Sequence, residues 1–286
     1  MIHIATVHFK SDRWISTQQE FLRKNIEGPH RIYAWLNDIP NARTDGFHYC
    51  CQEAVTPHAI KLNLLGDMMC FAAEDDDILI FIDGDAFPIA PIEPLLRAQL
   101  PKHKLVAVQR LENNGDLQPH PCFCATTARF WREIQGDWKA GYQWQTATGR
   151  METDVGGNLL KILRGRNVDW LPLLRSHDAT HHPVLFGIYA GLVYHHGAGF
   201  REAVTRFDMV HAKLNIFDRL LGVFPSRQRR IKRRKLGAEN KIWSEQVFAE
   251  IHANPRYFEE RLTPQHAHKG ELVTRAAAAQ AGLVMC

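Results

Sequence analysis

The sequence predicts an α/β fold built on a mostly parallel central sheet. Short apolar, β-branched segments alternate with segments of helical periodicity over about the first 200 residues, as expected for helices that cover a sheet. Residues 78–82 read Ile-Leu-Ile-Phe-Ile, and a strand that is apolar on both faces is usually buried in a parallel sheet between helices. We therefore expect one α/β domain over residues 1–212 and a helical, basic extension over residues 213–286.

The individual elements follow from local patterns along the chain. Runs of β-branched and apolar residues predict the strands, at residues 2–9, 31–36, 78–82, 105–109, 122–126, 168–171 and 187–194. Helical spacing of apolar residues predicts the helices, at residues 14–26, 58–74, from residue 128 and around 159–163. In the second helix Ile60, Leu64, Met68 and Phe71 have spacings of four, four and three, so we expect them to form its apolar face.

Composition and cysteine usage limit the class of protein. The 286 residues are 45% hydrophobic and 23% charged, which is typical of a globular protein and argues against a disordered, collagen-like or coiled-coil chain. The six cysteines form no Cys-x-x-Cys pair and the first residues contain no long apolar stretch, so we expect neither a secreted disulfide scaffold nor a signal peptide. No segment approaches the ~20 apolar residues of a membrane span. The sequence favours a cytoplasmic location, either free or peripheral at the cytosolic face of a membrane.

An acidic pair follows the buried strand at residues 78–82. The strand continues into Asp83-Gly84-Asp85, and residues i and i+2 of an extended chain point to the same side. Two carboxylates at the carboxyl edge of a parallel sheet favour a divalent cation, and hard oxygen ligands suit Mn²⁺ or Mg²⁺. Gly84 allows a ligand to approach the backbone closely. The alternative is a solvated turn after the strand.

The Ile-Asp-Gly-Asp stretch resembles the Asp-x-Asp motif of GT-A-type glycosyltransferases. Two further segments are similar to that family: Glu152-Thr153-Asp154 before a glycine pair and a helix, and the late strand that ends in His195-His196-Gly197. The resemblance covers roughly residues 2–205. It implies a GT-A-like α/β/α sandwich and a transferase that moves a sugar from a nucleotide-diphosphate donor, of UDP or GDP type, to a hydroxyl acceptor. The acceptor class would be a surface glycan or glycolipid precursor.

The resemblance also implies roles for particular residues. Asp85 would bind the metal directly, and Asp83 would bind it directly, through water, or contact the ribose. His195 or His196 would supply an imidazole ligand, with His195 favoured because Arg201 lies six residues on, where some retaining members place a cation against the diphosphate. The remaining expected donor-binding residues lie at the end of the first strand, on the helix before the acidic strand and beside the metal ligands: Thr6, His8, Lys10, Lys61, Gly84 and Gly197.

The chemistry that follows is the departure of a nucleoside diphosphate. A metal ion and Arg201 would stabilise the negative charge that develops on the leaving group. If the acceptor hydroxyl attacks directly it needs a base, for which Asp154 is the first candidate and Glu152 the second. Asp154 also precedes a predicted helix, where Asp is a preferred N-cap, and one residue could do both. His177 and His181 have zinc-ligand spacing, but Asp178 stands where a His-Glu-x-x-His motif needs Glu, so we favour a solvated loop.

The positive charge of the chain is concentrated in one segment. Residues 227–235 read RQRRIKRRK, and without this segment acidic residues would outnumber basic ones. Its seven cations are Arg227, Arg229, Arg230, Lys232, Arg233, Arg234 and Lys235. Apolar residues flank the segment, so contact with an anionic membrane surface is the preferred interpretation. The interpretation as a solvated helix face is nearly as well supported, and the interpretation as a nucleic-acid contact is the least supported.

Two other functions remain as alternatives. A haloacid-dehalogenase-like phosphatase also carries Asp-x-Asp after an apolar strand, but that family usually has the pair on its first strand, with Thr or Val two residues after the second Asp. Here the pair comes late and Phe87-Pro88 follows it. A non-catalytic nucleic-acid-binding protein could use the 227–235 segment, but that function would leave the acidic edge unexplained, so no nucleic-acid partner is expected.

Overall fold

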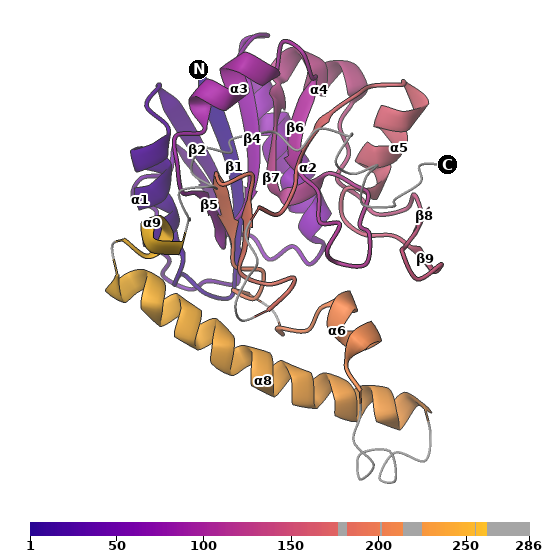
Figure 1. The fold of residues 1–286 in the computed structure, drawn as a ribbon. Helices are drawn as coiled ribbons and strands as arrows, with labels where there is room; N and C mark the ends of the chain where they lie inside the picture. Colours follow the sequence, from indigo (N-terminus) through magenta and orange to yellow (C-terminus); the bar gives the residue numbers. More distant parts are fainter. Residues whose placement is uncertain (177–181, 201, 214–224, 255, 262–286) are drawn as a thin grey trace.

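The computed structural model describes residues 1–176, 182–200, 202–213, 225–254 and 256–261. A seven-stranded sheet in the order β10-β6-β7-β4-β1-β2-β3 forms its centre (Figure 1). The strands are β1 (Ile2–Phe9), β2 (His30–Asn37), β3 (Tyr49–Cys51), β4 (Ile78–Asp83), β6 (Leu105–Val108), β7 (His120–Thr127) and β10 (Leu171–Leu173). β7 runs antiparallel to β4 and β6, and the other neighbouring pairs are parallel. The predicted α/β class with a mostly parallel sheet is confirmed.

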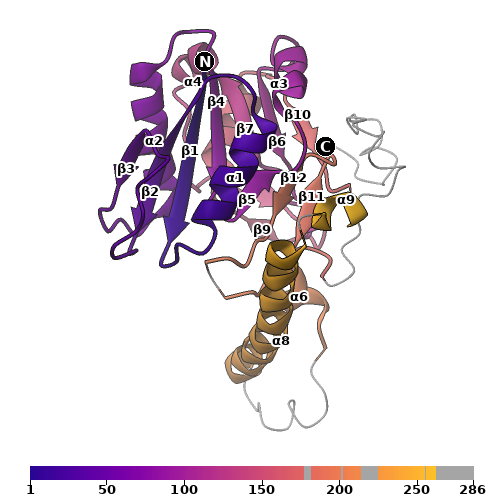
Figure 2. The same cartoon turned by 90° about the vertical axis from the view of Figure 1, so that its left-hand side faces the viewer.

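Helices cover both faces of the sheet, giving three layers (Figure 2). One face packs against α1 (Ile15–Asn25) and α3 (Glu93–Gln99). The other packs against α2 (His58–Ala72), α4 (Ala128–Ile134) and α5 (Gly157–Gly165). β4 explains the arrangement, because Ile78, Ile80 and Ile82 join the first apolar cluster while Leu79 and Phe81 join the second. A continuous apolar strand thus fills the cores on both sides.

The face that α2 buries differs from the predicted one. Of the expected apolar face, Ile60, Leu64 and Phe71 are 37%, 42% and 96% exposed. The helix instead turns another set of residues toward the sheet, namely Ala59, Lys61, Leu62, Leu65, Gly66 and Met69. Both sets have helical spacing, because α2 carries apolar residues on every side. Packing decides between them: a Cβ on Gly66 would lie 3.3 Å from the Phe81 ring, so glycine lets the helix approach β4 closely.

A second, three-stranded sheet lies at the carboxyl end of β4. It contains β5 (Ala86–Pro88), β11 (Gly187–Tyr189) and β12 (Val193–His195). The sequence predicted a single strand over 187–194, but Ala190 and Gly191 have φ of +51° and +68° and form a tight turn between two antiparallel strands. This turn brings His195 into register with Ala86. A short ribbon of β8 (Trp144–Gln145) and β9 (Met151–Glu152) lies apart from both sheets.

Helices make up much of the described chain after the sheets. Its described helices are α6 (Arg206–His211), α8 (Pro225–Ala253) and α9 (Tyr257–Arg261). α8 runs past the end of the sheet at which β1 and β4 finish (Figure 1), and Val247 and Ile251 pack with Trp14 and Phe87. The possible zinc site at residues 177–181 lies outside the described residues. So do residues 217 and 220–224, which are part of the apolar flank of the basic segment. Within the described ranges, no helix combines the length and apolarity needed to cross a bilayer.

Two leucines of α2 test which face is buried. Leu65 is fully buried and Leu64 is 42% exposed. Replacing Leu65 by Ala should lower the free energy of unfolding by about 2–5 kcal/mol, because it leaves a cavity against β4. Leu64→Ala, which removes the same atoms one position away, should change it by only about 0.5 kcal/mol. Equilibrium urea unfolding measures both, and a larger loss for Leu64→Ala would contradict the packing.

Candidate active site

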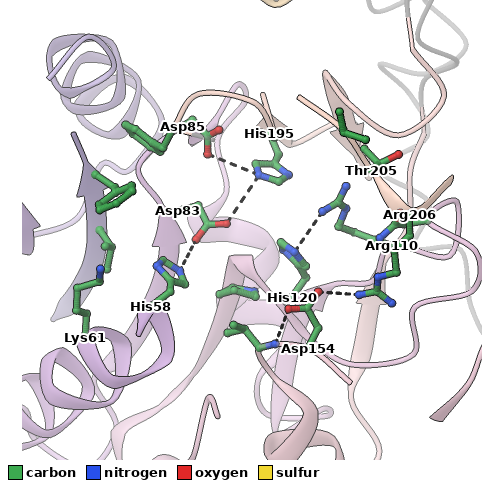
Figure 3. Close-up of a pocket in the computed structure, with 18 of the residues that line it drawn as sticks. His58, Lys61, Asp83, Asp85, Arg110, His120, Asp154, His195, Thr205 and Arg206 are labelled. Atoms are coloured by element: carbon green, nitrogen blue, oxygen red, sulfur yellow. Dashed lines mark hydrogen bonds and ion pairs between the residues drawn. The ribbon is translucent and has the colours of Figure 1, made fainter. Parts of the chain in front are cut away.

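A pocket of about 510 Å³ lies where β1 and β4 end. Its lining combines carboxylates, imidazoles and cations, as Figure 3 shows for Asp83, Asp85, His195, Lys61 and Arg110. β4 supplies Asp83, β12 supplies His195 and α2 supplies Lys61. Residues that are far apart in the sequence therefore meet at the carboxyl edge of the sheet, which is where ligands bind in open α/β folds.

Asp83, Asp85 and His195 form the acidic centre of this pocket. Each offers one ligand atom, and these atoms all lie within 4.8 Å of one another. His195 Nε2 is 3.8 Å from Asp83 Oδ2 and 3.6 Å from Asp85 Oδ1. In an octahedral Mg²⁺ or Mn²⁺ site with ~2.1 Å bonds, neighbouring ligand atoms are about 3 Å apart and opposite ones about 4.2 Å. Two carboxylates and an imidazole at these distances fit such an ion after shifts of a few tenths of an ångström.

Gln18 on α1 holds the loop that carries the two aspartates. Its Nε2 donates to the carbonyl oxygens of Asp83 and Ala86, each at 2.7 Å, while its Oε1 accepts from Thr6 and His8 at 2.9 and 3.1 Å. The amide group is thereby bonded on both sides in a buried position, so the loop is fixed relative to β1. A Cβ on Gly84 would lie 2.6 Å from the Val7 carbonyl oxygen, so this position requires glycine.

The two carboxylates have different surroundings. His58 Nε2 donates to Asp83 Oδ1 at 3.0 Å. Burial would raise the pKa of Asp83, but the His58 hydrogen bond and the nearby His120 and His195 rings hold that pKa well below its usual range. Asp85 Oδ2 accepts from the backbone N–H of Gly199 at 2.9 Å. Each aspartate thus has one oxygen held by the protein, which orients the other toward the shared centre.

Several residues chosen from the sequence lie elsewhere. Thr6 and His8 point from β1 toward Gln18 and are fully buried, whereas Val7 and Phe9 line the pocket. The alternation of side chains along a strand explains this. Burial lowers the pKa of His8 to about 4, so its ring is neutral. Lys10 is exposed and lines a neighbouring cavity.

The two adjacent histidines have different partners. His196 lies apart from the aspartates: its Nδ1 is 2.8 Å from the Tyr194 hydroxyl, and its Nε2 is 2.8 Å from Ser244 Oγ on α8. Because both ring nitrogens are engaged, His195 is the histidine placed at the carboxylates. Gly197, with φ of +73°, lines the pocket. Arg201 lies outside the described residues.

Of the two base candidates, only Asp154 lines the pocket, together with Lys61. Asp154 lines it and accepts from Arg206 Nη2 at 2.7 Å, whereas Glu152 lies in β9, outside the described lining. Gly156, and not Asp154, is the N-cap of α5. Lys61 is 2% exposed and donates to the Val55 carbonyl oxygen at 2.9 Å. Burial lowers its pKa.

The structure adds four residues that the sequence analysis did not identify. His58, Arg110, His120 and Arg206 all line the pocket. Arg206 bridges Asp116 at 2.8 Å and Asp154 at 2.7 Å. These residues follow no motif, and their proximity depends on how the loops after β6 and before α6 fold back. His58 alone had a local signal, since it begins the predicted helix that also carries Lys61.

Comparisons with known proteins find only distant structural similarity. No protein-family model and no curated protein sequence matches the chain. The solved structures to which it is similar include the mannosyltransferase PcManGT from Pyrobaculum calidifontis in complex with GDP-Man and Mn²⁺, at 14% identity and a TM-score of 0.34 over 48% of this chain and 47% of that one. They include the galactosyltransferase LgtC with donor and acceptor sugar analogs, at 12% identity and a TM-score of 0.34 over 56% and 70%. A putative glucose-1-phosphate thymidylyltransferase from Bacillus anthracis has 13% identity and a TM-score of 0.36 over 66% and 87%. The chain thus covers less than half of the mannosyltransferase, and its structural neighbours include glycosyltransferases.

The hydrogen bond from His58 should matter for metal binding. His58→Ala should weaken Mn²⁺ binding about 10- to 100-fold, because Asp83 loses the hydrogen-bond donor that orients it. His30→Ala is the matched control and should leave Mn²⁺ affinity unchanged, because His30 is the first residue of β2 and lies away from the carboxyl edge of the sheet. Electron paramagnetic resonance of free Mn²⁺ measures both, and equal affinity in the two variants would remove His58 from the site.

Proposed function

We propose that the protein is a metal-dependent glycosyltransferase that moves a sugar from a nucleotide-diphosphate donor to a hydroxyl acceptor. The observation that carries this proposal is the convergence of Asp83, Asp85 and His195 at the carboxyl edge of the sheet. An acidic centre that is bordered on one side by Lys61 suits a divalent cation that is shared with a diphosphate. The proposed acceptor class is a surface glycan or glycolipid precursor.

Each residue of the pocket has a role in this proposal. Asp83, Asp85 and His195 hold the metal, which when bound stabilises negative charge on the departing diphosphate. Lys61 borders the same space and contributes positive charge to the phosphates. Asp154 accepts the proton of the acceptor hydroxyl at Oδ1 or Oδ2. Its ion pair with Arg206 holds the carboxylate in place.

The basic segment of α8 supports a further part of the proposal, contact with an anionic membrane surface. Arg227, Arg229, Arg230 and Arg234 are exposed on this helix. Lys232 and Arg233 are turned toward the body of the protein, where Lys232 donates to the Met209 carbonyl oxygen at 2.7 Å and Arg233 pairs with Glu202 at 2.6 Å. The exposed cations remain available for lipid phosphates, each worth about 1 kcal/mol near an anionic surface.

The donor proposal predicts metal-dependent binding of a nucleoside diphosphate. UDP or GDP should raise the melting temperature of the protein when Mn²⁺ is present and not when EDTA replaces it, because the acidic centre repels a bare diphosphate. Asp85→Asn should abolish the shift, and Asp76→Asn, an exposed carboxylate before β4, should retain it. A thermal-shift screen of UDP, GDP and their sugars measures this. Binding that persists in Asp85→Asn with Mn²⁺ would contradict the proposed role of Asp85 as a metal ligand.

The membrane proposal is tested separately. Replacing Arg227, Arg229, Arg230 and Arg234 together by Gln should remove co-sedimentation with phosphatidylserine vesicles while leaving nucleotide-sugar hydrolysis intact. The matched control replaces four exposed arginines elsewhere by Gln, namely Arg23, Arg97, Arg129 and Arg166. This variant has the same net charge as the α8 variant and should still bind the vesicles. A wild-type protein that does not bind phosphatidylserine vesicles would contradict the membrane proposal. Loss of all activity in the α8 variant would favour a nucleic-acid function.

A further inference from the structure

The side of the pocket away from Lys61 contains a buried arginine with unused donors. Arg110, which follows β6, is 2% exposed and lines the pocket. Its Nε and Nη2 have no hydrogen-bond acceptor among the described residues. A buried donor without a partner is destabilising, and more so when the group is charged. The guanidinium is therefore expected to meet an acceptor that enters the pocket.

His120 contacts the same guanidinium group. The backbone N–H of Cys122 donates to His120 Nδ1 at 3.1 Å, which holds the ring in place, and His120 Nε2 lies 3.3 Å from Arg110 Nη1. This contact involves Nη1 alone, so Nε and Nη2 of Arg110 still have no acceptor among the described residues. A negatively charged oxygen of a ligand would accept most strongly from these two donors.

The carboxylates near Arg110 are bonded mainly to other groups. Glu112 Oε1 is 4.0 Å from Arg110 Nε and accepts from the Tyr189 hydroxyl at 2.8 Å. Asp116 is bonded to Arg206 and to Asn113, both at 2.8 Å. Both carboxylates stabilise the buried charge of Arg110, but neither accepts a hydrogen bond from its Nε or Nη2, so these donors can still meet an oxygen of a ligand.

Asn113 adds an acceptor for a hydroxyl group. Its Nδ2 donates to Asp116 Oδ2 at 2.8 Å, which fixes the orientation of the amide. Its Oδ1 is buried without a partner among the described residues, and the residue lines the pocket. We define Arg110, Asn113 and His120 as the Arg110 subsite. Donors for a charged oxygen beside an acceptor for a hydroxyl are the groups that an acidic sugar requires.

We propose that the Arg110 subsite binds the charged oxygens of an acidic sugar, a carboxylate or a phosphate monoester, carried either by the donor sugar or by the acceptor. This inference rests on the proposed transferase function for its place in a reaction. Figure 3 shows Arg110 and His120 beyond His195, on the far side of the pocket from Lys61. The His120 and His195 rings are 5.6 Å apart. The subsite is therefore next to the metal centre and separate from it, where the sugar rather than the nucleotide would lie.

Calorimetric titration of matched ligand pairs, with Mn²⁺ present, tests the proposal. The donor arm compares UDP-glucuronate with UDP-glucose, or the corresponding GDP pair if GDP is the nucleotide that binds. The acceptor arm compares glucose 6-phosphate with glucose, with and without the nucleoside diphosphate. The wild-type protein should bind the charged member about tenfold more tightly in one arm, because a hydrogen-bonded charge contributes roughly 1.5 kcal/mol or more. The arm with the preference identifies the source.

Variants of Arg110 separate recognition from other roles. Arg110→Gln should reduce the preference to about twofold or less, and Arg110→Lys should retain part of it, since Lys keeps the charge but loses the fork. Both should bind the nucleoside diphosphate alone like the wild type. Arg97→Gln, an exposed arginine on α3, is the matched control, and melting temperatures establish that each variant is folded.

Three results would overturn the proposal. The first is a wild-type protein without preference in either arm, a result that needs no variant. The second is a preference that survives in Arg110→Gln. The third is weaker binding of the nucleoside diphosphate itself in Arg110→Gln, which would assign Arg110 to the diphosphate. If no nucleotide binds, the proposed transferase function fails, and the acceptor arm without nucleotide still decides the Arg110 subsite.

Discussion

The site depends on one electrostatic constraint: two carboxylates stand close together at the end of a buried strand. Like charges at this distance and burial repel strongly unless positive or donor groups surround them. The fold supplies such groups from several elements, since α2 contributes His58, β12 contributes His195, and the Gly199 N–H bonds Asp85. The β11–β12 turn, the glycine at position 84 and the amide of Gln18 all keep these groups in register.

The pocket therefore has two electrostatic halves. Its Lys61 side and acidic centre suit a cation with a diphosphate, and its Arg110 side suits the oxygen of an acidic group. Complementary potentials select ligands and orient them more than they add raw affinity. A ligand that is charged at both ends would be held in one direction only between the two halves.

Much of the fold was predictable because strand and helix periodicity are local properties. The strands at residues 2–9 and 78–82 and the helix at 58–74 follow from such patterns and are confirmed. The buried face of α2 was not predictable, because two sets of residues had helical spacing and only packing against the sheet and α4 distinguishes them. The site divides in the same way: Asp83 and Asp85 belong to one motif, whereas Arg110 and His120 reach the pocket through loop geometry that no spacing encodes.

His196 has a consequence beyond its own packing. Its side chain contacts Ser244 on α8, and its backbone N–H donates to the Asp85 carbonyl oxygen at 3.0 Å. One residue thus joins α8 to one of the two aspartates at the centre of the site. Thermodynamic linkage makes such a connection reciprocal. If docking of α8 raises the affinity for a metal, then metal binding stabilises the docked helix by the same free energy. If α8 contacts a membrane and the aspartates hold a metal, as proposed, the same linkage would make membrane contact and metal binding parts of one equilibrium.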